Sequence, residues 1–314
     1  MTGFAHGIMV TQMAGNLVGR AKFLDLAPVI FLVSGTGHVG SVYGSSKAAQ
    51  WYADGVAIPG ATGETYTRTR QTEAAALSQV GSNVIPRPVL PIDLFAAGER
   101  GFLTDPSAPG TLFRTTALAV PSATGDPVGY AADQSGRGNH LTQTVAADRP
   151  LLEVTGGRSS LVLNGVNQRM NVPLPNRTAN MYLAGCISIV PGTIGTLFGN
   201  TAANGYFLLR AQSNNPVPHS NLAGAPTTWV DGVAIGPNRT DLYAALQDGL
   251  PHVVEVTGAN LTDAGWSTAI VGSIQTATFF SGRIYGLMLT SHVPDAATRA
   301  AVRAAFAARG GIGS

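Results

Sequence analysis

Turn-forming residues recur along the whole of this sequence, and they restrict the chain to folds built from many short segments. Its 314 residues include 39 glycines and 19 prolines, a share well above the roughly 12% that these two residues have on average. The pairs Asp54-Gly55 and Asp231-Gly232 favour tight hairpins, because Gly tolerates positive φ and Asp is one of the few other residues that share it. The recurrence of such turns predicts a mostly β fold with few long helices.

The chain carries few charges, and their signs nearly balance. Charged residues are 11% of the sequence and the net charge is +2, whereas about a quarter of the residues are charged in ordinary soluble domains. The arginines are scattered, which argues against nucleic-acid binding. The apolar run Ala27 to Val33 is too short to span a bilayer, and no cationic leader with an apolar stretch precedes it. We therefore expect a protein made in the bacterial cytoplasm that does not insert into membranes.

Cys186 is the only cysteine, so no internal disulfide is expected. It lies in the apolar segment Gly185 to Val190, which indicates a strand. A small hydrophobic thiol in such a setting is usually buried and unreactive. We predict a packing role for Cys186 rather than a nucleophilic one.

Two motifs are typical of nicotinamide enzymes but stand in the wrong order. Gly35-Thr-Gly-His-Val-Gly40 matches the dinucleotide fingerprint, with Asp54 at about the expected distance. Asp54, however, precedes its strand and lies in a hairpin turn. Tyr43 and Lys47 have the spacing of a dehydrogenase pair, but they directly follow the glycines instead of lying on a later helix. No cofactor is predicted.

The first predicted domain spans residues 28–86, after an N-terminal docking arm at 1–27. Val29 to Val33 is typical of a buried strand. The segment from Gln50 to Thr67, with Trp51, Asp54-Gly55 and Tyr66, resembles the small immunoglobulin-like domains of bacterial and phage surface proteins. The resemblance implies that Trp51 packs between two sheets. Thr72 to Gln79 has a more helical pattern than the final strand of that family.

Closely spaced prolines indicate a linker at 87–93, and the second predicted domain spans 94–314. An ordered series of motifs runs through it: Leu94 to Ser107, Asp126 to Gly129, Asp133 to His140, Leu161 to Gln168, Thr228 to Ile235, Asp248 to Val256 and Phe280 to Leu289. This series resembles the concanavalin A-like (laminin-G-like) domains of spike and tail-fibre proteins in phages, prophages and gene transfer agents. The resemblance implies a large jelly-roll sandwich.

Local patterns agree with that fold. Val253 to Val256 and Ile284 to Leu289 are strand-like. A single helix is expected at the C-terminus, where Pro294-Asp295 favours its start and Gly310-Gly311 its end. Phe306 is expected to pack back onto the sandwich. The pentapeptide Asp-Gly-Val-Ala-Ile occurs at 54–58 and at 231–235, which we interpret as two similar hairpins.

The sequence offers no arrangement of acids that glycan hydrolysis requires. That chemistry needs two carboxylates held several ångströms apart, and a strand would present them at alternate positions. The glutamates of the second domain, Glu99, Glu153 and Glu255, are solitary. No nucleophile elbow accompanies its histidines, although a Ser-His-Asp site is not ruled out by sequence alone. We predict that the protein is not an enzyme.

The segment from Asp133 to Asn139 has several oxygen-bearing side chains, as some calcium loops do. It lacks the spacing of an EF-hand, and Arg137 intrudes. An Asx-type turn is the favoured interpretation. No metal site is predicted.

Sugar-binding sites combine an aromatic side chain with amide, Arg or carboxylate groups. The candidates are Trp266, Trp229, Tyr206, Arg210, Asn214 and His219. For the two tryptophans a packing role is the alternative.

Taken with the resemblance, these features predict a virion surface spike or fibre protein that binds host envelope or capsular glycans without catalysis. Its partners would be other virion structural proteins, through the N-terminal region, and host surface polysaccharide. A symmetric homo-oligomer is expected, as is usual for fibres. The alternatives are a purely structural decoration or connector protein and a glycan depolymerase.

Overall fold

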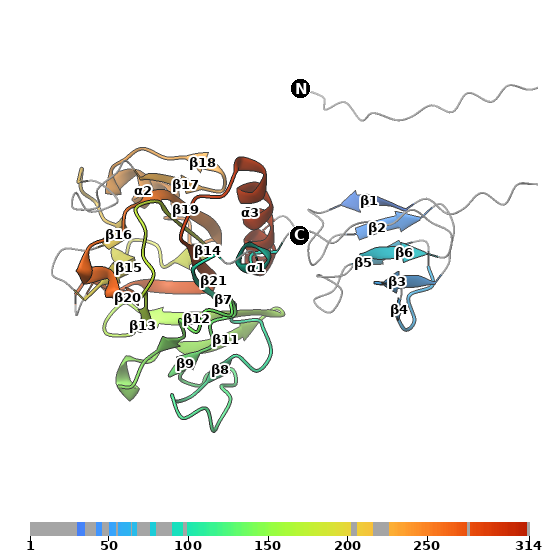
Figure 1. Ribbon diagram of the computed structural model, residues 1–314, viewed down its shortest axis with the longest axis horizontal. Coiled ribbons are helices and arrows are strands. Elements are labelled where there is room, and N and C mark those ends of the chain that lie inside the picture. The colour runs from blue at the N-terminus through green and yellow to red at the C-terminus, as the bar shows by residue number, and fades with distance from the viewer. Residues whose placement is uncertain are drawn as a thin grey trace, which may run out of the picture.

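The structure is a computed structural model, and its strands far outnumber its helices (Figure 1). The residues that it describes are 30–34, 42–45, 50–54, 56–63, 65–67, 76–79, 90–96, 99–201, 206–215, 226–274 and 277–312. For Ile30–Ser34 and Tyr206–Arg210 only the backbone is described. The predicted docking arm at 1–27 lies outside these residues. Of the predicted linker, the described part forms a turn that leads into the first helix.

The small N-terminal unit contains two three-stranded antiparallel sheets. One sheet has the order β1 (Ile30–Ser34), β2 (Val42–Ser45), β5 (Thr65–Thr67), and the other β4 (Val56–Ala57), β3 (Trp51–Ala53), β6 (Leu77–Gln79). This division of the strands between two sheets is that of the immunoglobulin fold. Trp51 is fully buried beside Tyr43 and Leu77, and its indole N–H donates to the Gly63 carbonyl at 2.9 Å. The predicted core role of Trp51 is confirmed.

Within Thr72 to Gln79 the structure describes residues 76–79, and there it corrects the helical expectation. Leu77–Gln79 forms β6, which pairs with β3 so that Leu77 lies opposite Ala53. Leu77 is completely buried. Pairing with a neighbouring strand and burial of one apolar side chain outweigh a weak local helical preference.

The two Asp-Gly hairpins are built in the same way, as the repeated pentapeptide predicts. Asp54 and Asp231 both adopt positive φ, at 48° and 49°. The Asp231 N–H donates to the Val253 carbonyl and its Oδ1 accepts from the Val253 N–H, both at 2.8 Å. Asp54 makes the same two bonds with Ala76, at 2.9 and 2.8 Å. In each hairpin the turn aspartate thus bonds the hairpin to the chain at the start of the neighbouring strand of its sheet, β6 or β19.

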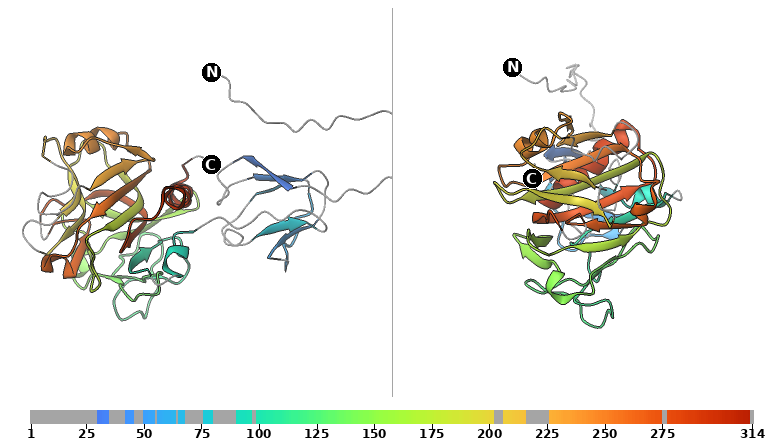
Figure 2. Two further views of the ribbon diagram at one scale, coloured as in Figure 1. Left: turned by 45° about the horizontal axis from the view of Figure 1, so that its top comes forward. Right: turned by 90° about the vertical axis from the view of Figure 1, so that its left-hand side faces the viewer.

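The large unit is a jelly-roll sandwich of two antiparallel sheets packed face to face (Figure 2). The seven-stranded sheet has the order β16 (Tyr206–Arg210), β15 (Gly195–Asn200), β20 (Thr268–Val271), β13 (Met170–Pro173), β10 (Leu141–Thr142), β9 (Tyr130–Ala131), β8 (Leu112–Phe113). The eight-stranded sheet has the order β11 (Leu151–Thr155), β12 (Arg158–Asn164), β21 (Ser281–Thr290), β14 (Met181–Ile189), β19 (His252–Ala259), β17 (Thr227–Val230), β18 (Val233–Ala234), with β7 (Gly101–Thr104) paired to β21. The predicted fold class is confirmed.

The central strand β14 is buried on both faces. Leu183 and Ile187 face the core between the sheets. Tyr182, Ala184 and Cys186 face outward into a second apolar cluster beneath the C-terminal helix. Cys186 is a free, buried cysteine, and burial raises the pKa of its thiol far above the usual range. The predicted packing role of Cys186 is confirmed.

Helices are few. In the described residues they are α1 (Asp93–Ala96), α2 (Arg239–Ala245) and α3 (Ala296–Gly310), with short 3-10 turns at Ala146–Asp148 and Ala264–Ser267. In the described part of the chain no helix has the length and apolar character needed to cross a membrane.

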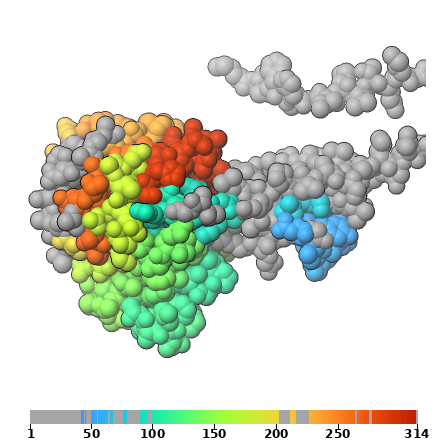
Figure 3. Space-filling model, in the orientation of Figure 1, coloured from blue at the N-terminus to red at the C-terminus, as the bar shows by residue number. Residues whose placement is uncertain are grey.

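The C-terminal helix α3 begins and ends where the sequence predicts. The Asp295 carboxylate accepts from the Thr298 N–H at 2.8 Å, and Gly311 ends the helix with φ of 73°. Phe306 packs onto the sandwich, as predicted. Arg309 pairs with Asp105 at 2.9 Å. Figure 3 shows the C-terminal segment (red) against the chain near residue 100 (teal), so α3 closes over the start of the large unit.

Candidate functional site

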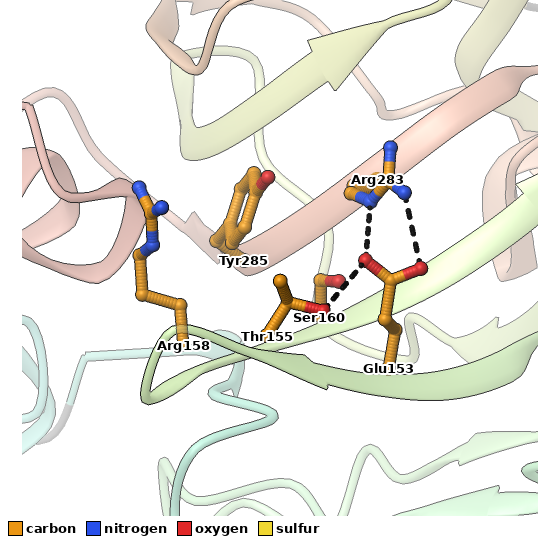
Figure 4. Close-up of a pocket in the computed structure, with 6 residues that line it drawn as sticks. All are labelled: Glu153, Thr155, Arg158, Ser160, Arg283 and Tyr285. Carbon is orange, nitrogen blue, oxygen red and sulfur yellow. Dashed lines mark hydrogen bonds and ion pairs between the residues drawn. The ribbon is translucent and has the colours of Figure 1, made fainter. Parts of the chain in front are cut away.

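A hollow of about 190 Å³ lies on the outer face of the eight-stranded sheet. Its lining comes from three adjacent strands: Glu153 and Thr155 from β11, Arg158 and Ser160 from β12, Arg283 and Tyr285 from β21. Each strand contributes two residues spaced i and i+2, which place their side chains on one face of a sheet. Figure 4 shows these six side chains converging. The hollow is smaller than a drug-sized pocket and suits one small polar unit.

The rim of the hollow includes a two-point ion pair. Arg283 Nε donates to Glu153 Oε1 at 2.8 Å, and its Nη2 donates to Oε2 at 3.0 Å. The Thr155 hydroxyl adds a third bond to Oε1 at 3.3 Å. The hydrogen bonds from Arg283 hold the pKa of Glu153 below its ordinary value, and Glu153 raises the pKa of Arg283. Both side chains are therefore charged at neutral pH and fixed in orientation.

Tyr285 and Ser160 form the largely buried floor of the hollow. Tyr285 occupies a β-bulge: opposite β14, Gly286 pairs with Cys186 and Ile284 with Ile187, so Tyr285 has no direct partner. Bulges re-aim side chains and are common beside functional sites. The tyrosine ring lies between Arg158 and Arg283 (Figure 4).

Arg158 is the most exposed charge at the hollow. Its Nη1 donates to the carbonyl of Gly310, the last residue of α3, at 2.6 Å. That bond orients the guanidinium and leaves most of its five N–H donors directed elsewhere. Arg158 therefore offers an oriented cation beside the aromatic floor.

The second-domain glutamates lie on different elements, and each is engaged by its own partners. Glu255 is fully buried on β19, where its carboxylate accepts from the Tyr182 hydroxyl at 2.8 Å and from Arg303 Nε at 2.7 Å. Three strands, β12, β21 and β14, separate Glu255 from Glu153 on β11. At about 4.8 Å per strand, this places the two backbones roughly 19 Å apart. That exceeds the separation of glycosidase carboxylate pairs.

Trp266 is not a surface residue, which corrects its place among the candidates for sugar contact. It is only 2% exposed and belongs to the core between the sheets. Its ring stacks on Phe198 with 5.9 Å between centroids, and Phe198 stacks in turn on Phe102. Although the neighbouring residues are polar or small, the gain from burying a large apolar ring directs the Trp266 side chain into the core.

Trp229 is half-buried on β17, facing away from the core. The guanidinium of Arg299, from α3, lies over its ring at 4.9 Å from the centroid. The indole Nε1–H is directed at the Thr257 hydroxyl, 3.4 Å away. One face of the ring is thus covered by α3, an arrangement that favours a packing role through a cation–π contact.

The remaining candidates do not join these two tryptophans in one place. Tyr206 and Arg210 lie on β16, at the edge of the seven-stranded sheet, and their side chains are not described. Asn214 is exposed just beyond that strand. His219 lies outside the described residues. The three candidates whose side chains are described, Trp266, Trp229 and Asn214, do not line the hollow.

The loop after Asp133 is an Asx-type turn, as favoured from the sequence. Asp133 Oδ1 accepts from the Ser135 and Leu103 N–H groups, at 2.9 and 3.0 Å. Its Oδ2 accepts from the Ser135 hydroxyl and the Asn139 N–H, at 2.8 and 2.9 Å. The carboxylate is thus used to hold the loop. Across the part of the chain that the structure describes, no group of three or more His, Cys, Asp or Glu side chains is placed to hold a metal ion.

The described histidines bond to carboxylates or to backbone. His140 Nδ1 accepts from the Asp133 N–H at 3.0 Å, and His292 pairs with Glu99. His252 bridges Asp231 and Asp248, at 2.6 and 3.0 Å. These contacts tie loops to the sandwich.

Comparisons with known proteins give no family. No protein-family model matches the chain, and no curated protein matches it in sequence. Several solved structures are distantly similar. A GH54 α-L-arabinofuranosidase soaked with a cyclic sulfate inhibitor has 15% identity and a TM-score of 0.38, covering 60% of this chain and 52% of its own. Domain 4 of AbnA, a GH43 extracellular arabinanase from Geobacillus stearothermophilus in complex with arabinotriose, has 13% identity and a TM-score of 0.35, covering 55% and 92%.

A third is an arabinofuranosidase complexed with arabinofuranosyl-α-1,2-xylobiose, with 12% identity and a TM-score of 0.40, covering 91% of this chain and 62% of its own. This chain therefore spans about half the length of the GH54 enzyme. Likenesses at these TM-scores assign neither a family nor a function to this chain.

Proposed function

We propose that this protein binds glycans through the hollow formed by Glu153, Thr155, Arg158, Ser160, Arg283 and Tyr285, and that it does so without catalysis. The observation that carries the proposal is the convergence of an aromatic floor with fixed charged groups at one small hollow. Sugars present an apolar ring face and several hydroxyls, which aromatic and charged side chains respectively contact. Both partners of the Glu153–Arg283 pair are held in place before any ligand arrives, which lowers the cost of ordering on binding.

The absence of catalysis is part of the proposal. It is supported by the wide separation of Glu153 and Glu255 along the sheet and by the cationic partner on each, Arg283 and Arg303. A carboxylate already bound by a guanidinium is a poor proton donor at neutral pH. Release of reducing sugar from a glycan bound by the protein would contradict this part.

We propose further that this activity belongs to a virion surface, which is supported only by the resemblance of the two sequence units to phage and gene-transfer-agent proteins. On this account the large unit contacts host envelope or capsular polysaccharide, and the N-terminal region contacts other virion proteins. Electron microscopy of particles with and without this chain tests that location.

A structural connector is the second candidate, and exposed apolar side chains favour it. Val190, Ile194 and Leu250 are 44%, 54% and 61% exposed. Gly249, next to Leu250, lies against Pro191, next to Val190, so these apolar groups share one region of the surface, as is typical of surfaces that contact another protein. A connector would assemble with virion proteins and bind no glycan.

The experiment is a glycan array probed with the full chain and with Glu153→Gln and Arg283→Gln. The control is the Arg114–Asp126 pair, a partly exposed ion pair in which two guanidinium nitrogens contact one carboxylate oxygen, at 2.6 and 2.9 Å, and which does not line the hollow. We expect binding that falls at least tenfold in Arg283→Gln and is unchanged in Arg114→Gln, whereas Glu153→Gln releases Arg283 from its partner and should alter which glycans bind; all three variants should be folded by circular dichroism. An equal loss in the control, or no glycan bound by the folded wild type, would contradict the proposal.

A further inference from the structure

The hollow holds more positive than negative charge. Among the six lining residues, Arg158 and Arg283 are cationic and Glu153 is the only acid. Glu153 is neutralised by two hydrogen bonds from Arg283. Arg158 has no carboxylate partner among the described residues: its bond is to the Gly310 carbonyl, a neutral group. One whole positive charge thus remains at the rim.

The hydrogen-bonding capacity of the hollow has the same bias. The acceptor oxygens of Glu153 already receive bonds from Arg283 and Thr155. Arg158 and Arg283 between them carry ten N–H donors, and only three are used in the contacts above. A neutral sugar hydroxyl offers both a donor and an acceptor, whereas the unused groups of the two arginines are N–H donors only. A carboxylate only accepts, and it matches the planar fork of a guanidinium.

On this basis, and resting on the proposed glycan binding, we propose that the hollow selects acidic sugars, with the sugar carboxylate bound by Arg158 and the sugar ring seated over Tyr285. The ligand class is therefore a uronic-acid-type unit of a polysaccharide. The bond from Arg158 to Gly310 makes α3 a support for this contact, because it holds the guanidinium above the floor. Arg158 acts here as a specificity-determining residue, since its charge distinguishes an acidic unit from its neutral counterpart.

The test uses two ligands with one backbone, polygalacturonate and its fully methyl-esterified form, titrated into the full chain. We expect the acidic form to bind at least tenfold more tightly, with the preference shrinking as salt is raised. Arg158→Gln should lose about tenfold to a hundredfold in affinity for the acid, which is the effect of removing one charge-assisted hydrogen bond. Arg158→Lys should retain part of the preference, and Arg114→Gln all of it.

Two outcomes would overturn the inference. Equal affinity for the acidic and esterified forms would refute acid selection while leaving glycan binding intact. An unchanged acid preference in Arg158→Gln would show that another cation reads the carboxylate. If neither ligand binds and the glycan array is also empty, the proposed function fails together with the inference. The melting temperature of each variant controls for loss of the Gly310 contact.

Discussion

Glu153 and Arg283 meet in a two-point ion pair on the outer face of the sheet, although 130 residues separate them in the chain. Their strands, β11 and β21, are not neighbours, because β12 lies between them. The pair therefore bridges across β12, and Ser160 of that strand forms part of the floor of the hollow. Such a bridge fixes the hollow's rim with groups that remain open to solvent.

The Glu153–Arg283 pair should contribute little to folding, because both side chains are partly exposed and exposed ion pairs are weak. A double-mutant cycle with Glu153→Gln and Arg283→Gln, measured by urea unfolding, should give a coupling free energy below about 1 kcal/mol. A coupling of several kcal/mol would instead show that the pair is a structural clasp.

The buried pair beneath α3 should behave in the opposite way. Glu255 is fully buried, and Arg303 Nε lies 2.7 Å from its carboxylate. Arg303→Met leaves a buried charge without a cation and should lower the free energy of unfolding by about 3–5 kcal/mol. Adding Glu255→Gln should recover part of that loss, because it removes the charge. If the single variant loses less than about 1 kcal/mol, the pair is not essential to the attachment of α3.

His252 predicts a stability change in alkaline conditions. Hydrogen bonds from its ring to Asp231, and also to Asp248, raise its pKa from 6.5 to about 9. Because the folded pKa lies above the unfolded value, the stabilisation is complete below pH 6.5 and is lost as the pH rises through about 9. We expect about 1–2 kcal/mol, allowing for the exposure of both carboxylates.

Urea unfolding of the wild type and His252→Gln, compared at pH 6 and pH 9.5, measures this contribution. The stability difference between the two proteins should be present at pH 6 and nearly absent at pH 9.5. A difference that stays constant across this range would contradict the assigned pKa.

Trp266 should matter to stability and not to ligand contact. Trp266→Ala removes a buried ring and should cost about 3–5 kcal/mol, whereas Trp266→Phe keeps an aromatic partner for Phe198 and should cost less. The folded Trp266→Phe protein should bind glycans as the wild type does, measured on the same array. A selective loss of binding in that variant would restore Trp266 as a sugar-contact residue.

Features set by a few adjacent residues were predictable from the sequence. The two Asp-Gly hairpins follow from residues that tolerate positive φ, and the ends of α3 follow from Asp295 and Gly311. The Asx turn at Asp133 depends on contacts two and six residues away, together with one to Leu103. The resemblance to immunoglobulin-like domains predicted that Trp51 packs between two sheets, and Trp51 is fully buried.

The hollow was not predictable in the same way, because it depends on strand order. The alternating pairs Glu153/Thr155, Arg158/Ser160 and Arg283/Tyr285 are visible in the sequence, and they are the signal that would have marked one polar face. That β21 lies beside the β11–β12 hairpin is set by the long-range pairing of β12 with β21, and the bulge at Tyr285 arises in the long-range pairing of β21 with β14. For Trp266 the flanking Gly and Asp residues suggested a surface loop, whereas its burial depends on Phe198, which is distant in sequence.

The central claim is that glycans bind on the outer face of the eight-stranded sheet, and a crystal of the full chain soaked with an oligosaccharide chosen from the array tests it most directly. The account predicts sugar density over Tyr285, within hydrogen-bonding distance of Arg158 and Arg283. Sugar density only elsewhere, such as at the edge strand β16 or beside Trp229, would contradict it.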